Sequence, residues 1–158
     1  MNYASSLITA KRYIEDLKLW FEATSDEIFL SNLKICSEDL NTIIKSSSEC
    51  KTLIISRSTI DTSGLLDFSI DTEYKIKFLS FQCCGYGDRS NWVKKKHELF
   101  KILKAINQCD LKYSLKSISL HHFDNQYLGS LKELRKLAEE AGLQGDMIVN
   151  DKWGPIEA

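Results

Sequence analysis

The sequence has little net charge. Its 21 Lys and Arg residues are nearly balanced by 22 Asp and Glu residues, which leaves a formal net charge of −1. A chain with this balance has no overall field that would attract nucleic acid or an anionic membrane. The local exception is Lys94-Lys95-Lys96, which we interpret as a solvated helix face. We therefore expect no nucleic-acid partner.

The sequence also lacks long apolar runs and any regular cysteine pattern. No stretch approaches the roughly 18 consecutive apolar residues of a membrane span. The first residues lack a basic start followed by an apolar run, and Glu15 and Asp16 come early, so neither a secretory signal nor an Arg-rich transit segment is expected. The five cysteines are odd in number and irregularly spaced, which suits a reducing compartment better than a disulfide framework. We expect an intracellular, cytoplasmic protein.

What is present indicates one folded domain with two flanking segments. The chain has 158 residues, of which 43% are hydrophobic and 27% charged, enough for a single core and unlike a disordered tail. Residues 1–26 are interpreted as an N-terminal helical segment, 27–150 as the main domain and 151–158 as a tail. An apolar stripe at 3- and 4-residue spacings predicts a helix over 3–23, which is either a cap on the domain or the end of a coiled coil. The stripe consists of Leu7, Ala10, Ile14, Leu17 and Phe21.

Strands and helices are expected to alternate through the main domain. The apolar and polar alternation predicts strands over 27–35, 51–60, 76–82, 115–121 and 147–149. Helices are predicted from Ser37 as N-cap to about residue 46, over 92–107, and over 126–141 with Asp124 or Asn125 as the cap. Gly142 is at the position of a C-cap glycine. The irregular stretch 83–91 is predicted to be an insertion loop.

The strands repeat at a roughly constant interval. The aligned apolar positions are Leu30, Ile55, Phe81, Leu120 and Val149, which are 25, 26, 39 and 29 residues apart. Strand–helix alternation of this length favours right-handed crossovers and a parallel sheet. The strands alternate between apolar and polar residues, whereas strands of a doubly wound sheet are buried on both faces and read as continuous apolar runs. A sheet with one solvated face fits the sequence better.

The repeated pattern resembles a known family. The segment Cys50-x-x-Leu53-x-Ile55-x-x-Ser58-x-Ile60 is similar to the strand-and-turn signature of the leucine-rich repeat superfamily, in its ribonuclease-inhibitor-like branch. The family's Asn or Cys ladder position is occupied here by Leu33, Ser58, Cys84 and Phe123, of which only Cys84 matches. The resemblance covers 27–150 and implies a short, degenerate α/β solenoid. It would have four to five parallel strands, helical or irregular convex segments and an N-terminal capping helix.

The resemblance also implies a function. Members of this family are characteristically protein-binding scaffolds that use the concave face of the sheet, and the resemblance implies a non-catalytic protein–protein interaction module. The partner-binding residues expected on that face are Phe29, Ser31, Thr52, Ile54, Ser56, Phe78, Ser80, Gln82, Ser117, Ser119 and His121. An equally weighted alternative is that the apolar members are covered by the 3–23 helix or by a neighbouring chain segment.

No catalytic, metal or cofactor site is expected. Cys83-Cys84 lacks the spacing of a redox pair or zinc knuckle, and adjacent histidines such as His121 and His122 on a strand point to opposite faces. The stretch 85–89 resembles part of a phosphate loop but lacks its third glycine and its Gly-Lys-Ser/Thr. Tyr86, Arg89 and Trp92 are residue types enriched at interface hot spots, and they are also expected to bind a partner.

Two other functions remain open from the sequence. One is a structural subunit of a large assembly that contacts its neighbours through 83–96. The other is a small flavodoxin-like or thiol-redox enzyme, which would need a ligand at the carboxyl ends of the strands or an acidified thiol.

Overall fold

The computed structural model describes residues 26–68, 72–82, 85–86, 92–121 and 130–150. The helix predicted over 3–23, the pair Cys83-Cys84, Arg89, Asp124 and the tail 151–158 lie outside the described residues.

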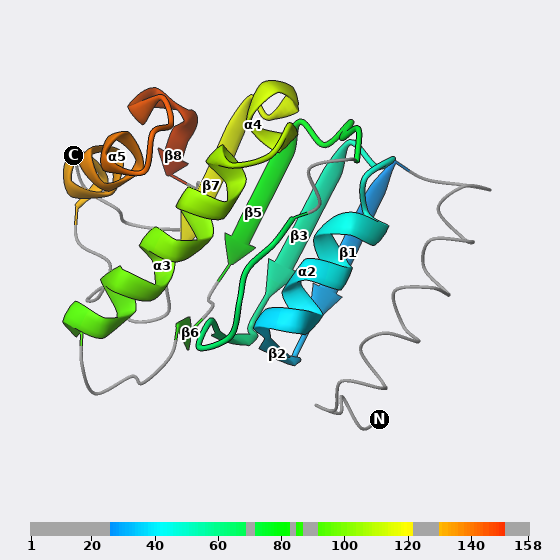
Figure 1. Cartoon of the computed structure of the whole chain (residues 1–158), viewed down its shortest axis with the longest axis horizontal. Helices are drawn as coiled ribbons and strands as arrows, with labels where there is room; N and C mark the ends of the chain where they lie inside the picture. Colours follow the sequence, from blue (N-terminus) through cyan, green and yellow to red (C-terminus); the bar gives the residue numbers. More distant parts are fainter. Residues whose placement is uncertain (1–25, 69–71, 83–84, 87–91, 122–129, 151–158) are drawn as a thin grey trace.

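The described chain is a mixed α/β fold built on a five-stranded, fully parallel sheet (Figure 1). The strands, in their spatial order, are β1 (Glu27–Ser31), β3 (Thr52–Ser56), β5 (Phe78–Gln82), β7 (Ser117–His121) and β8 (Ile148–Asn150). A second parallel sheet contains the short strands β2 (Lys34–Cys36), β4 (Thr59–Asp61) and β6 (Gly85–Tyr86). The described α-helices are α2 (Ser37–Ser46), α3 (Trp92–Asn107), α4 (Leu111–Ser114) and α5 (Leu131–Glu140), and a 3₁₀ turn, η1 (Gly145–Met147), precedes β8.

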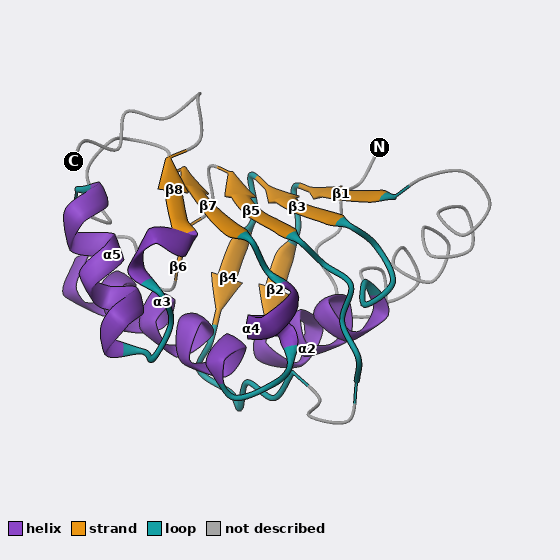
Figure 2. Cartoon of the chain, turned by 90° about the horizontal axis from the view of Figure 1, so that it is seen from above, coloured by secondary structure: helices purple, strands orange, loops and turns teal. Residues whose placement is uncertain are grey.

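The helices cover one side of the five-stranded sheet (Figure 2). After β1 and after β3 the chain turns into a short strand of the second sheet, and then passes through α2 or an irregular segment before it returns to the next strand. Because each main strand pairs with the next main strand along the chain, the order of the described strands does not reverse. On the other side of the sheet no described helix covers the strands.

The register of the sheet confirms most of the predicted alignment. Leu30 pairs with Ile55, Ile55 with Phe81 and Phe81 with Leu120, and all four side chains are at most 1% exposed. The placement of Val149 in this row was wrong, because Asn150 pairs with Leu120 and Val149 pairs with Ser119. The two buried rows are Ile28, Leu53, Leu79, Ile118, Ile148 and Leu30, Ile55, Phe81, Leu120.

The prediction of single strands over 27–35 and 51–60 was also wrong. Each of these segments is two strands joined by a sharp corner, at which Asn32 and Arg57 have positive φ angles of 62° and 48°. A residue in this left-handed region turns the chain abruptly and ends the extended conformation. The amide of Asn32 still donates to the carbonyl of Ser56, at 3.2 Å, so the stacking continues through the corner. The short strands β2 and β4 of the second sheet begin just after these corners.

The side chain of Ser58 forms hydrogen bonds to backbone groups at two successive corners of the chain. Its Oγ accepts a hydrogen bond from the amide of Leu33 at 3.2 Å and donates to the carbonyl of Ser56 at 2.8 Å. Ser58 is only 2% exposed, so these bonds satisfy backbone groups that have lost contact with water. Ser58 therefore links one corner to the corner before it.

The helix boundaries follow local capping chemistry. The N-cap of α2 is Cys36 rather than the predicted Ser37, because the Cys36 thiol accepts from the amide of Asp39 while the Asp39 carboxylate accepts from the amide of Cys36. Ser130 and Glu133 form the same reciprocal box at α5. The predicted helix over 126–141 is thus α5 with Ser130 as its cap. The helix predicted over 92–107 and the glycine at the end of α5, Gly142 at φ 97°, are confirmed.

A buried carboxylate joins α3 to the irregular segment that follows β4. Glu98 is 4% exposed and accepts hydrogen bonds from the amide and from the hydroxyl of Thr62. The ammonium of Lys101 lies 3.5 Å from the other Glu98 oxygen and donates to the carbonyl of Thr62 at 3.3 Å. The charge of Glu98 is therefore paired and hydrogen-bonded, as a buried carboxylate requires.

Candidate functional site

The side of the five-stranded sheet that no described helix covers, here called the open face, carries most of the predicted partner-binding residues. It consists of three rows of side chains that cross the strands in register. The first row is Glu27, Thr52, Phe78 and Ser117; the second is Phe29, Ile54, Ser80, Ser119 and Val149; the third is Ser31, Ser56, Gln82 and, by its backbone position, His121.

Three apolar side chains on adjacent strands form a patch at the β1 end of the open face. Phe29 is 48% exposed, Phe78 is 38% exposed, and Ile54 is half-buried. Phe29 pairs directly with Ile54, and Phe78 lies on the next strand, diagonal to Ile54. Neighbouring strands are about 4.8 Å apart, so these side chains are within reach of one another. Grouped apolar side chains facing solvent are typical of an interaction surface.

Serines occupy the middle of the open face beside this patch. Ser117 and Ser119 are partly exposed, whereas Ser56 and Ser80 are only 7% and 8% exposed. The expectation that all of these positions are open to water is corrected for Ser56 and Ser80, each of which has a longer side chain beside it in its row, Gln82 beside Ser56 and Ile54 beside Ser80. The open face is therefore uneven, with apolar side chains standing above a serine floor.

Tyr86 and Trp92, two of the remaining predicted residues, belong to other elements than the strands of the open face. Tyr86 belongs to β6, where its backbone pairs with Ile60 in the second sheet, and Trp92 is the first residue of α3. The assignment of 83–91 as a loop is corrected at Gly85–Tyr86, which form a strand. Arg89 lies outside the described residues.

Val149 is an open-face residue that the sequence interpretation missed. It pairs with Ser119 at the β8 end of the second row and is half-buried. Met147-Ile148-Val149 is a continuous apolar run, so it has no alternation from which the inward residue can be identified.

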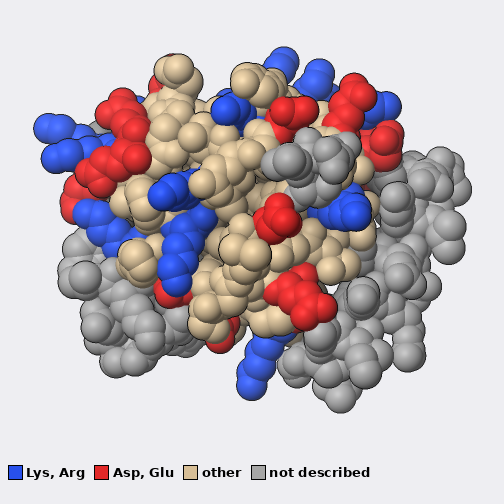
Figure 3. Space-filling model, viewed as in Figure 1, with Lys and Arg blue, Asp and Glu red and all other residues tan. Residues whose placement is uncertain are grey.

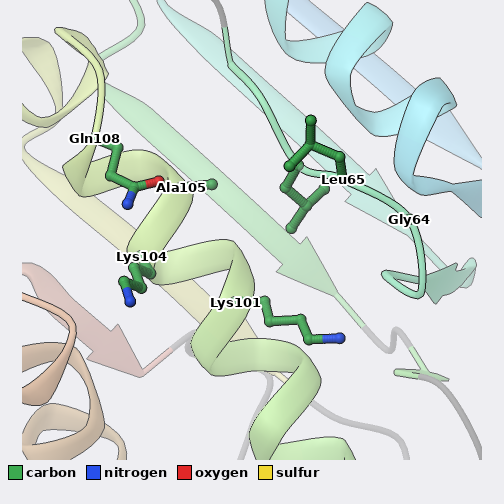
Figure 4. Close-up of a pocket in the computed structure, with 7 residues that line it drawn as sticks. Gly64, Leu65, Lys101, Lys104, Ala105 and Gln108 are labelled. Carbon is green, nitrogen blue, oxygen red and sulfur yellow. The ribbon is translucent and has the colours of Figure 1, made fainter.

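The helix side of the molecule carries a groove between α3 and residues 64–66 (Figure 4). Its volume is about 290 Å³, and it is lined by Gly64, Leu65, Leu66, Lys101, Lys104, Ala105 and Gln108. Leu65 is 81% exposed. Elsewhere on this side, basic and acidic side chains are interspersed (Figure 3).

Burial suppresses the ionisation of two thiols. It raises the pKa of Cys50 from its ordinary value of 9.0 to about 12, and it raises the pKa of Cys109 as well. A thiol with a raised pKa is protonated near neutral pH and is a poor nucleophile. Neither Cys50 nor Cys109 is therefore suited to thiol chemistry.

We expect stability to fall in alkali because of Cys50. Above about pH 9 the unfolded chain releases the Cys50 proton while the folded chain retains it until about pH 12, so the free energy of unfolding decreases as pH rises through this interval. Urea unfolding of Cys50→Ala should show lower stability at neutral pH but a shallower decline above pH 9. Burial also raises the pKa of Tyr74 to about 12. Tyr74 contributes equally to the pH dependence of stability in the wild type and in Cys50→Ala. Parallel stability curves for the two proteins would contradict the prediction.

Comparisons with known proteins supply no relative. A scan against protein-family models and searches of curated proteins and of solved structures return no match to this chain. Within the described residues, no helix has the length and apolar character needed to cross a membrane, and no group of three or more His, Cys, Asp or Glu side chains is placed to hold a metal ion.

Proposed function

We propose that this chain is a short leucine-rich-repeat-like solenoid that binds another protein through its open face, without catalysis. The solenoid assignment is supported by the in-register rows, by the strand order that never reverses, and by Ser58, which bonds to the preceding corner. Stacked repeats of this kind give a rigid surface.

The observation that carries the functional proposal is the patch of Phe29, Ile54 and Phe78. These side chains project from three adjacent strands of a hydrogen-bonded sheet, so little conformational freedom remains to be lost when a partner binds. Aromatic residues are favoured anchors in protein interfaces, and the neighbouring serines leave room for a partner's side chains. The patch therefore fits a protein surface better than a small ligand, which prefers a concave pocket.

The strand order favours this function over the flavodoxin-like alternative. Doubly wound sheets bind ligands where the strand order reverses, and the described sheet runs β1-β3-β5-β7-β8 with no reversal. The raised pKa values of Cys50 and Cys109 weigh against a thiol-redox role for those two residues.

The proposal is tested by comparing the proteins that the wild type and two variants capture from a lysate of the source organism. The double variant Ile54→Asp with Phe78→Asp places charges in the patch and should reduce the amount of captured partner by about a hundredfold or more. The control, Tyr113→Asp, changes an aromatic residue that is 77% exposed on α4 and should capture them as the wild type does. Circular dichroism and thermal unfolding establish that each variant is folded. Partners that survive the double change would contradict the assignment of the open face.

A further inference from the structure

The groove between α3 and residues 64–66 has one wall that is held rigidly. The side-chain amide of Asn41 donates to the carbonyl of Leu65 at 3.0 Å and accepts from the amide of Asp67 at 2.8 Å. At the other end of this wall, the amide of Gly64 donates to Ser37 Oγ at 3.1 Å. These bonds fix the backbone on both sides of Leu65, whose side chain nevertheless stays 81% exposed. The groove is therefore preorganised, which lowers the cost of ordering it around a ligand.

The groove combines an apolar interior with cationic groups. Ala105 is buried beneath it, Leu66 packs against the core, and Leu65 stands at its edge. Among the residues that the structure describes, its charged lining residues are Lys101 and Lys104. Lys101 is paired with Glu98, whereas Lys104 forms no ion pair within the described residues. Lys104 is thus the cation most available to a ligand.

The size of the groove limits what it accepts. Its volume of about 290 Å³ is at or below the lower end of the roughly 300–1,000 Å³ typical of small-molecule and cofactor pockets. Such a space suits one or two amino-acid side chains. Complementarity to an apolar interior and a free ammonium requires a ligand that pairs an aliphatic group with a carboxylate.

We propose that this groove binds a short segment of a partner protein in which leucine-like residues are flanked by acidic ones. An aliphatic side chain of the segment lies between Leu65 and Ala105, and a carboxylate contacts Lys104. The site is on the helix side of the sheet (Figures 1 and 4), so it does not depend on the function proposed for the open face.

The test is an NMR titration of the full chain with a short peptide of leucines flanked by aspartates. The amide signals of Leu65, Ala105 and Gln108 should shift with saturable binding. Lys104→Glu and Leu65→Asp should each weaken the affinity about tenfold, because they introduce a like charge or remove an apolar wall. The control Lys132→Glu, at an exposed lysine of α5, should bind as the wild type does.

Three results would overturn the proposal. Groove signals that do not respond to millimolar peptide would exclude the site. Equal binding of a peptide with lysines in place of the aspartates would show that charge does not select the ligand. Shifts of the same signals with protein concentration alone would identify a second copy of the chain as the occupant.

Discussion

Replacing Phe81 with alanine is expected to lower the free energy of unfolding by about 4 kcal/mol, within the range for deleting a buried aromatic side chain. Phe81 is 1% exposed and is the largest side chain in its buried row, on the central strand β5. Its removal leaves a cavity among Ile55, Leu120 and the helices that cover them. Urea unfolding followed by circular dichroism measures the loss.

Phe78→Ala is the matched control, because it makes the same chemical change on the same strand. Phe78 lies on the open face and is 38% exposed, so the variant should lose no more than about 1 kcal/mol. Equal losses for the two variants would mean that the sheet does not have one buried and one open side as described.

Replacing Glu98 with alanine is expected to cost about 3 kcal/mol, because breaking a buried, hydrogen-bonded ion pair leaves its partners unsatisfied. The amide and hydroxyl of Thr62, which is fully buried, would lose their acceptor, and Lys101 would lose its counter-charge. Urea unfolding again measures the change in the free energy of unfolding. The variant should also loosen the segment after β4, which amide hydrogen exchange at Thr62 would detect as faster exchange.

Glu140→Ala is the control for Glu98→Ala. Glu140 is exposed at the end of α5, and surface substitutions of this kind usually change stability by no more than about 0.5 kcal/mol. If Glu98→Ala is as stable as Glu140→Ala, then Glu98 does not join α3 to the segment after β4.

The two buried rows were predictable because two independent signals agree on them. Alternation along each strand separates Leu53 and Ile55 from Thr52 and Ile54, and repetition along the chain places equivalent residues side by side. The same alternation predicted the exposure of Phe29 and Phe78. Where alternation is missing, as in Ile148-Val149, the inward residue could not be identified.

The corners were not predictable from the sequence. Neither Asn32 nor Arg57 is a glycine, and Arg57 is not among the residues that commonly adopt a positive φ. Their conformations are stabilised by contacts with the neighbouring strand, as in the hydrogen bond from the amide of Arg57 to the carbonyl of Gln82, at 2.8 Å. That contact forms only once the strands have paired, so no local sequence pattern predicts it.

The polar links and the groove depend on residues that are distant in the sequence. Glu98 lies 36 residues beyond Thr62, and in the sequence it is one of several charged residues on an amphipathic helix. Leu65 and Lys104 line one groove only because the segment after β4 packs beside α3. The low exposure of Ser56 and Ser80 likewise depends on the heights of neighbouring side chains on other strands.

The most direct test of the open face is the affinity of a purified partner, once capture has identified one. Calorimetry should give Phe78→Asp an affinity at least about a hundredfold weaker than that of the wild type, which is the range of an interface hot spot. Tyr113→Asp should bind with unchanged affinity. A dissociation constant for folded Phe78→Asp equal to that of the wild type would contradict protein binding through the open face.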